Sequence, residues 1–162
     1  MTLIGERWLD AQGEIKTYWR VEKKDSLIVI PVQNELLLLP EPYYRPGVGE
    51  NTLDFPGGRY DHRLSWAEAA RTILQREMQI SREHIQTVQL LNPQGWNIDS
   101  SFANQRLFVT EAQIDNAIPW QDLPVLRAEP ANIKGAQNIL TRLSCLQCRC
   151  ALLQWMLNQN LY

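Results

Sequence analysis

The sequence predicts an α+β fold in which strands and helices form one domain, residues 1–162. Nearly continuous apolar runs at 26–32 and 36–39 are typical of buried strands. The stretch 53–80 changes from the two-residue period of a strand to the period of a helix. From about 132 to 158, apolar residues recur at helical spacing and predict a C-terminal helix beginning at an Asn132 cap.

Composition limits the classes of function. The chain is 44% hydrophobic and 21% charged, so a packed core is expected, and its net charge of −2 gives no reason to expect nucleic-acid binding. An apolar run of about 20 residues is absent from the sequence, and neither a membrane span nor a signal peptide is predicted. The three cysteines crowd one short segment, which argues against a disulfide framework and for a cytoplasmic location.

The N-terminal elements are expected to be strands, over about residues 1–25. A hairpin is predicted from Trp8 to Trp19, with its turn at Gln12-Gly13. The apolar runs at 26–32 and 36–39 are expected to pair as a second hairpin through Gln33-Asn34-Glu35.

The stretch 53–80 organises the rest of the chain. Leu53 and Phe55 alternate with polar neighbours, and Pro56-Gly57-Gly58 ends that strand. Ser65 begins a helix, and Glu68 completes a capping box three residues later. A loop between a strand end and a helix start is a good place to hold phosphates.

Residues 57–80 resemble the Nudix box, which reads Gly, five residues, Glu, seven residues, then Arg-Glu-apolar-any-Glu-Glu-any-Gly-apolar. From Gly58 the spacing fits without insertion or deletion. The charged positions depart from it. The first Glu is Leu64, the Arg-Glu pair is Thr72-Ile73, the Glu-Glu pair is Arg76-Glu77, and the final Gly is Gln79. The box is therefore degenerate, and Glu77 alone remains of its charged pattern.

The resemblance implies an α/β/α sandwich, a mixed sheet packed between helices. It also implies cleavage of nucleoside diphosphate derivatives with Mg²⁺ or Mn²⁺, which prefer oxygen ligands. Positions 73, 76 and 77 share a helix face, and here their formal charges sum to zero. Glu77 is the one metal-ligand and catalytic candidate from the box and is insufficient alone, so ordinary hydrolysis is doubtful.

Two further segments resemble the ADP-ribose pyrophosphatase branch of the family. Tyr43-Tyr44-Arg45-Pro46 is similar to its Gln-Tyr-Arg-Pro segment, which implies that Arg45 contacts the ligand; the alternative is a surface turn. In the loop 92–101, Asp99 lies near a Glu that is a base or metal ligand in that branch, or else it caps the loop. Trp96 could stack on a nucleobase or serve in packing.

Four arginines in the box region, Arg59, Arg63, Arg71 and Arg76, are either solvated or stand in for the missing metal. In the second case Arg59 and Arg76, with Gly57 and Gly58, would bind a diphosphate. Cys145 and Cys148 form a Cys-x-x-Cys pair, a common zinc half-site. We expect this pair, with Cys150, to lie inside the C-terminal helix, and no second ligand pair follows, so buried small residues are favoured over zinc.

Three functions follow. The first is a binding protein for a nucleotide-diphosphate-type small molecule, with little or no hydrolysis. The second is an active hydrolase of ADP-ribose or a related compound, using carboxylates among Asp61, Glu68, Glu77 and Asp99 with Mg²⁺ or Mn²⁺. The third is an interaction scaffold, a homodimer through its N-terminal strands as the resemblance implies.

Overall fold

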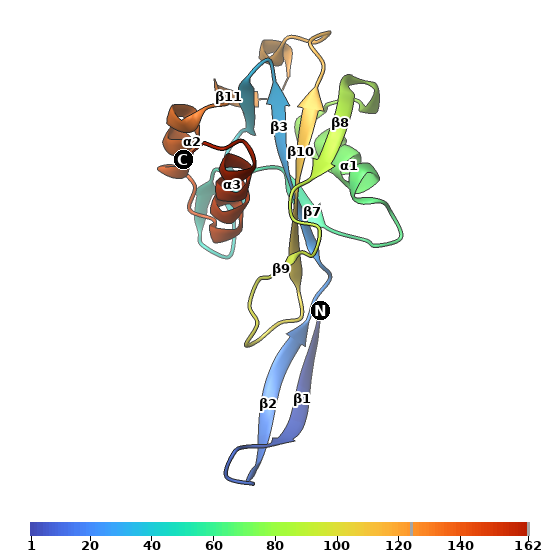
Figure 1. The fold of residues 1–162 in the computed structure, drawn as a ribbon, viewed down its shortest axis with the longest axis vertical. Coiled ribbons are helices and arrows are strands. Elements are labelled where there is room, and N and C mark those ends of the chain that lie inside the picture. Colours follow the sequence, from blue (N-terminus) through green and yellow to red (C-terminus); the bar gives the residue numbers. More distant parts are fainter. Residues whose placement is uncertain (124, 162) are drawn as a thin grey trace.

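The computed structural model describes residues 1–123 and 125–161. A seven-stranded mixed sheet lies between helices on both faces (Figure 1), which confirms the predicted α+β sandwich. The strand order is β11-β4-β3-β10-β8, with β7 beside β3 and β9 beside β10. Among the strand pairings of this sheet that the structure describes, only β3–β10 is parallel. The strands are β3 (Ser26–Gln33), β4 (Leu36–Pro40), β7 (Gly57–Arg59), β8 (Ile85–Leu90), β9 (Trp96–Asn97), β10 (Arg106–Ile114) and β11 (Val125–Pro130).

Strand β3 is apolar on both sides because both sides are buried. Leu27 and Val29 pack in the core beneath α1 (Trp66–Met78), whereas Ile28 and Ile30 pack in the core beneath α3 (Leu146–Asn158). Helix α2 (Ile133–Leu140) lies on the α3 side, and short 3₁₀ helices span Arg82–His84 and Trp120–Asp122. A continuous apolar run is what such a doubly covered strand requires.

The predicted hairpin between β3 and β4 is confirmed. Its two loop residues, Asn34 and Glu35, have φ angles of 49° and 58°. Positive φ at both positions is the geometry of a type I′ turn, whose twist matches that of the strands it joins.

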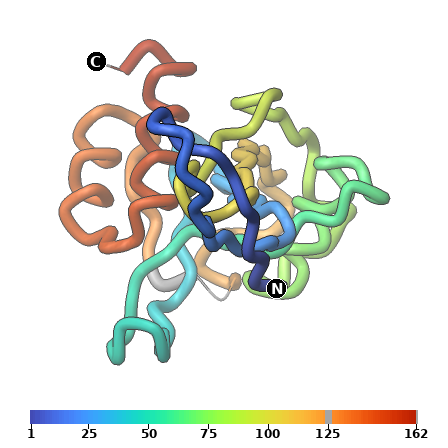
Figure 2. The backbone as a smooth tube through the Cα atoms, turned by 90° about the horizontal axis from the view of Figure 1, so that it is seen from below, coloured from blue at the N-terminus to red at the C-terminus, as the bar shows by residue number. Residues whose placement is uncertain are grey.

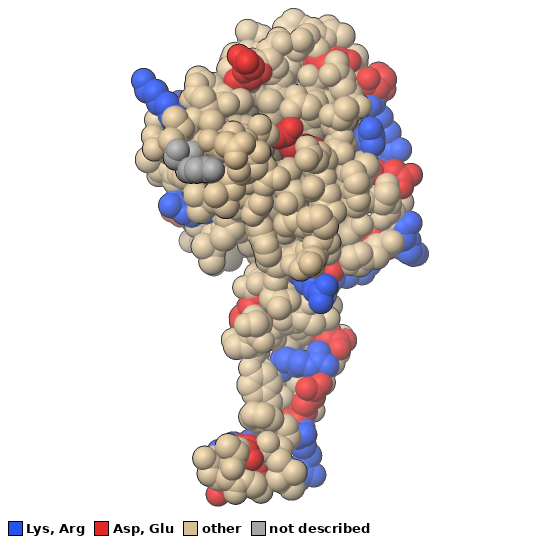
Figure 3. All heavy atoms as spheres, viewed as in Figure 1, with Lys and Arg blue, Asp and Glu red and all other residues tan. Residues whose placement is uncertain are grey.

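The predicted N-terminal hairpin is also confirmed, and it projects away from the body (Figures 1 and 2). It pairs β1 (Thr2–Leu9) with β2 (Ile15–Glu22) as a separate two-stranded sheet. A third hairpin, β5 (Tyr43–Arg45) with β6 (Glu50–Thr52), leaves the body in another direction (Figure 2). Figure 3 shows that much of the charge of the N-terminal hairpin lies along one of its edges.

The prediction of one long helix from about 132 to 158 is wrong, because the structure contains two helices. Asn132 does cap α2, since its side chain accepts a hydrogen bond from Gly135 N. However, α2 ends at Leu140, and Cys145 is the N-cap of α3. The Arg149 guanidinium donates to the carbonyl oxygens of Leu140 and Leu143, so the break satisfies carbonyl groups that a helix end leaves free.

Among the residues described, no helix is long and apolar enough to cross a membrane. The cytoplasmic location stays a prediction. The single-domain organisation over 1–162 also stays a prediction, and its range includes positions 124 and 162, which lie outside the described residues.

Candidate functional site

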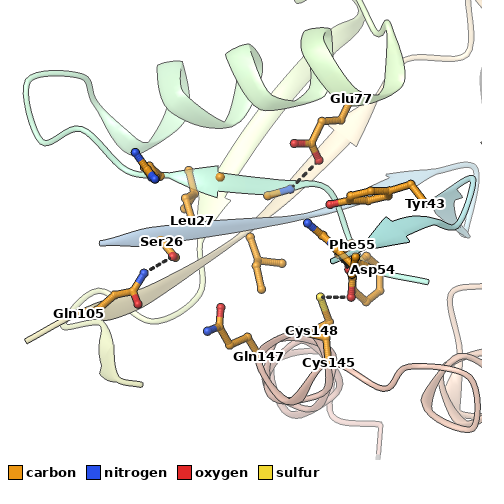
Figure 4. A pocket seen from close by; sticks show the side chains of 15 residues that line it. Ser26, Leu27, Tyr43, Asp54, Phe55, Glu77, Gln105, Cys145, Gln147 and Cys148 are labelled. Carbon is orange, nitrogen blue, oxygen red and sulfur yellow. Dashed lines mark hydrogen bonds and ion pairs between the residues drawn. The ribbon is translucent and has the colours of Figure 1, made fainter. Parts of the chain in front are cut away.

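A cleft of about 370 Å³ opens where the edge of β3 changes partner. Strand β7 pairs with Ser26–Ile28, whereas β4 pairs with Val32 and Gln33. The segment between β6 and β7 crosses the gap and contributes Asp54 and Phe55 to the wall (Figure 4). Five of the residues predicted to bind a ligand or metal line this cleft, namely Arg45, Gly57, Gly58, Arg59 and Glu77. Arg76 does not line it but contacts Gly57 and Glu77, which do.

Arg76 and Glu77 both bind the backbone of Gly57. Glu77 reaches from α1 toward β7 (Figure 4), and its Oε2 accepts a hydrogen bond from Gly57 N at 3.0 Å. Arg76 Nη2 donates to Gly57 O at 2.9 Å and is also ion-paired with Glu77 Oε1. One guanidinium therefore holds a carbonyl oxygen and a carboxylate oxygen, two kinds of ligand that a hard divalent cation prefers.

Gly58 leaves room for this arrangement. A Cβ atom at position 58 would lie 2.9 Å from Arg76 Nη2, so a larger residue would displace the guanidinium. The absence of a side chain here allows Arg76 to reach across the strand to the Gly57 carbonyl.

The box residues do not fit Mg²⁺ or Mn²⁺. Ile73 is 3% exposed and packs in the core beneath α1. Of the three box carboxylates, Asp61, Glu68 and Glu77, only Glu77 lines the cleft, and Arg76 already neutralises it. With no net negative charge from positions 73, 76 and 77, a divalent cation lacks the ligands that it needs.

Arg45 is held at the cleft by an acidic partner. Its Nε and Nη2 atoms lie 2.8 Å and 2.7 Å from Asp54 Oδ2, and its guanidinium lies 3.8 Å from the centre of the Tyr43 ring. Asp54 is buried, and its Oδ2 also accepts a hydrogen bond from Thr52 Oγ1 at 3.0 Å. The Arg45 side chain remains 41% exposed, so part of it faces the cleft.

Asp54 was not predicted as a site residue, and Cys145 lies just outside the helix that was predicted to contain it, whereas Cys148 and Cys150 lie inside α3. Cys145 and Cys148 lie at the start of α3, not inside a longer helix, and both line the cleft. Cys148 Sγ lies 3.7 Å from Asp54 Oδ1 (Figure 4). These two residues are 94 positions apart. No local spacing pattern could therefore have joined them.

The two thiols differ in acidity because they share a hydrogen bond. A hydrogen bond from Cys148 lowers the pKa of Cys145 to about 6. The same bond, together with burial, raises the pKa of Cys148 far above its usual range. Cys145 is thus the thiol that ionises first.

The structure does not bring Asp99 and Trp96 to this cleft. Asp99 is exposed, and its Oδ1 accepts hydrogen bonds from Ser101 N at 3.2 Å and Ser101 Oγ at 2.7 Å, which is a loop-capping arrangement. Trp96 lines a separate hollow of about 330 Å³ beside Gln154. The loop 92–101 folds on itself and against α3, and this places both side chains apart from Glu77.

Asp61, Arg63 and Glu68 of the box have local partners. Arg63 pairs with Asp61, and this arginine holds the pKa of the Asp61 carboxyl far below its usual range. Glu68 accepts a hydrogen bond from Ser65 N, and Ser65 Oγ accepts one from Glu68 N, so the predicted capping box is confirmed. Neither Asp61 nor Glu68 lines the cleft.

The fold is similar to that of a known enzyme. The crystal structure of an ADP compounds hydrolase matches with a TM-score of 0.76 over 99% of this chain and 88% of the other, at 18% sequence identity. No family model and no curated protein matches the sequence. The likeness establishes a Nudix-like fold, with a mixed sheet and helices on both faces.

Proposed function

We propose that this protein binds a nucleotide-diphosphate-type small molecule in the cleft and hydrolyses it slowly or not at all. The observation that supports this most directly is Arg76, whose guanidinium holds Gly57 O and Glu77 in place of a cation. A diphosphate needs positive charge around it, and a guanidinium fork can supply that charge without a metal.

The remaining contacts would come from the cleft wall. Arg45 and Arg59 both line it and would extend the positive charge along the ligand. Gly57 and Gly58 allow a close approach to β7. Asp99 and Trp96 are left out of this proposal because they lie elsewhere. The structural neighbour, an ADP compounds hydrolase, suggests ADP-ribose as the first probe.

The first prediction concerns metal independence. In thermal unfolding with ADP-ribose, we expect stabilisation in the presence of a chelator, rising to about 2.7 kcal/mol at a hundredfold excess over the Kd. Arg76→Glu should abolish that stabilisation, whereas Arg71→Glu makes the same charge change on the same helix and should retain it. Chromatography after prolonged incubation with Mg²⁺ or Mn²⁺ should show little product.

Two results would contradict the proposal. Unchanged affinity in Arg76→Glu would remove Arg76 from the site. Rapid product formation by the wild type with Mg²⁺ or Mn²⁺ would favour the alternative of an active hydrolase that uses non-standard carboxylates.

A dimeric scaffold is the second candidate, and the N-terminal hairpin favours it. The hairpin carries exposed apolar residues on a two-stranded sheet that extends away from the body (Figure 1). Isolated two-stranded sheets are marginal in water, and exposed apolar patches mark interaction surfaces. A second copy of this chain would cover it.

A further inference from the structure

We infer that Asp54, Cys145 and Cys148 form a binding site for one zinc ion in the wall of the cleft. One oxygen of Asp54 and the two sulfur atoms all lie within 4.8 Å of one another. This inference goes beyond the proposed ligand binding, and its three metal ligands are not among the residues proposed to bind the nucleotide.

The distances suit tetrahedral zinc. Zn–S bonds of about 2.3 Å and Zn–O bonds of about 2.1 Å, at a tetrahedral angle, place sulfur and oxygen about 3.6 Å apart. The observed separation between Cys148 Sγ and Asp54 Oδ1 is 3.7 Å. Little rearrangement is therefore needed for both atoms to contact one ion.

The surroundings of Asp54 orient its free oxygen toward the thiols. Arg45 and Thr52 both bind Oδ2, which leaves Oδ1 directed at Cys148. Hydrogen bonds to the far side of a ligating carboxylate are typical of metal sites, because they fix the orientation of the ligand. Asp54 is 5% exposed, so its position is set by packing as well as by these bonds.

The charges also balance. Two thiolates and one carboxylate carry three negative charges, while Zn²⁺ and the Arg45 guanidinium together carry three positive ones. Thiolate ligands select zinc over Mg²⁺ or Mn²⁺, which prefer oxygen. A Cys145–Cys148 disulfide would use the same two sulfur atoms, but it would give no role to the Asp54 oxygen that faces them.

The position of the site in the fold gives it two consequences. Zinc would join the segment between β6 and β7 to the start of α3, and so would tie together parts of the chain on two sides of the sheet gap (Figure 4). Three protein ligands leave a fourth coordination position open, as in catalytic zinc sites. Since all three residues line the cleft, a water molecule or a ligand oxygen could fill that position.

The test is a zinc titration of the reduced, chelator-treated full chain in competition with a chromophoric chelator. We expect one Zn²⁺ per chain, and with Co²⁺ the thiolate-to-metal charge-transfer band and intense visible bands of a tetrahedral site. Cys145→Ser and Cys148→Ser should each weaken zinc binding at least about 100-fold, since outer-shell changes alone cost about 10–100-fold. Cys150→Ser, on the same helix, is the matched control and should bind as the wild type does.

Three outcomes would overturn the inference: no zinc bound by the reduced wild type, equal loss in Cys150→Ser, or cobalt spectra without thiolate bands. Circular dichroism of each variant separates loss of the site from loss of the fold, and Cys145 is half-buried, so Cys145→Ser is expected to fold. Because the probe is zinc alone, failure here leaves the ADP-ribose proposal standing, and failure with ADP-ribose leaves the zinc inference standing.

Discussion

Arg76 and Glu77 are adjacent in the sequence and have opposite roles at the backbone of Gly57. Glu77 fixes the backbone N–H of Gly57, while Arg76 takes the carbonyl oxygen of the same residue and cancels the charge of Glu77. A divalent cation could bind here only after displacing the guanidinium from two oxygen partners. The zero net charge of positions 73, 76 and 77 can be read from the sequence because spacing on one helix is a local property.

The zinc candidate could not be predicted in the same way. Cys145 and Cys148 lie within one turn at the start of α3, but their third partner, Asp54, comes from a distant segment. A contact of that kind exists only once the sheet gap and the start of α3 are in place. The sequence shows the two cysteines close together, and the fold brings the Asp54 carboxylate to them.

Gln79 carries backbone strain that can be removed. Gln79 is the C-cap of α1 and lies in the left-handed region, with φ 54° and ψ 23°. The Nudix box, which residues 57–80 resemble, has Gly at this position. That conformation costs a residue with a Cβ roughly 1–2 kcal/mol, and Gly adopts it freely at an entropic cost in the unfolded chain. We predict that Gln79→Gly raises the free energy of unfolding by up to about 1 kcal/mol in urea denaturation.

The matched control for this change is Gln75→Gly, the same substitution at an exposed position inside α1. Glycine in a helix interior costs about 1 kcal/mol. The two variants should thus shift stability in opposite directions, and a shift of the same sign in both would refute the strain at Gln79.

At the scale of elements, the break between α2 and α3 shows why apolar periodicity predicted one helix where the structure has two. Leu143 lies in the break, yet it is 3% exposed and packs in the same core as Ile139 and Leu152. The buried positions therefore continue at near-helical spacing across a segment that is not helical. Strand β11 (Val125–Pro130) was not among the strands expected from the sequence.

The N-terminus of α1 was predictable because its signal is local. Ser65 and Glu68 exchange the hydrogen bonds of a capping box. We predict that Ser65→Ala lowers the free energy of unfolding by about 1 kcal/mol in urea denaturation. Ser81→Ala is the control, because Ser81 is also an N-cap but its side chain makes no capping bond. Equal losses in the two variants would mean that the capping box contributes nothing to the free energy of unfolding.

At the scale of the whole molecule, the N-terminal hairpin is the feature least explained by the rest of the fold. The register places Leu9 opposite Ile15 and Gly5 opposite Trp19, all on one face with Leu3. The Trp19 ring covers Gly5, where a Cβ would lie 3.0 Å from the ring. This face remains open to solvent, with Leu9 64% and Ile15 63% exposed.

An open apolar face on a thin sheet should be covered in solution, and we propose that the hairpin of a second copy covers it. Ile15→Glu places a charge on this face, in the pair next to the turn, and should convert a dimer, of twice the 18.8 kDa chain mass, into a monomer in sedimentation equilibrium. Trp8 lies on the opposite face of the same hairpin, so Trp8→Glu should leave the dimer intact. A wild type that stays monomeric as its concentration rises would contradict the proposal, and the hairpin would then need a different partner to cover it.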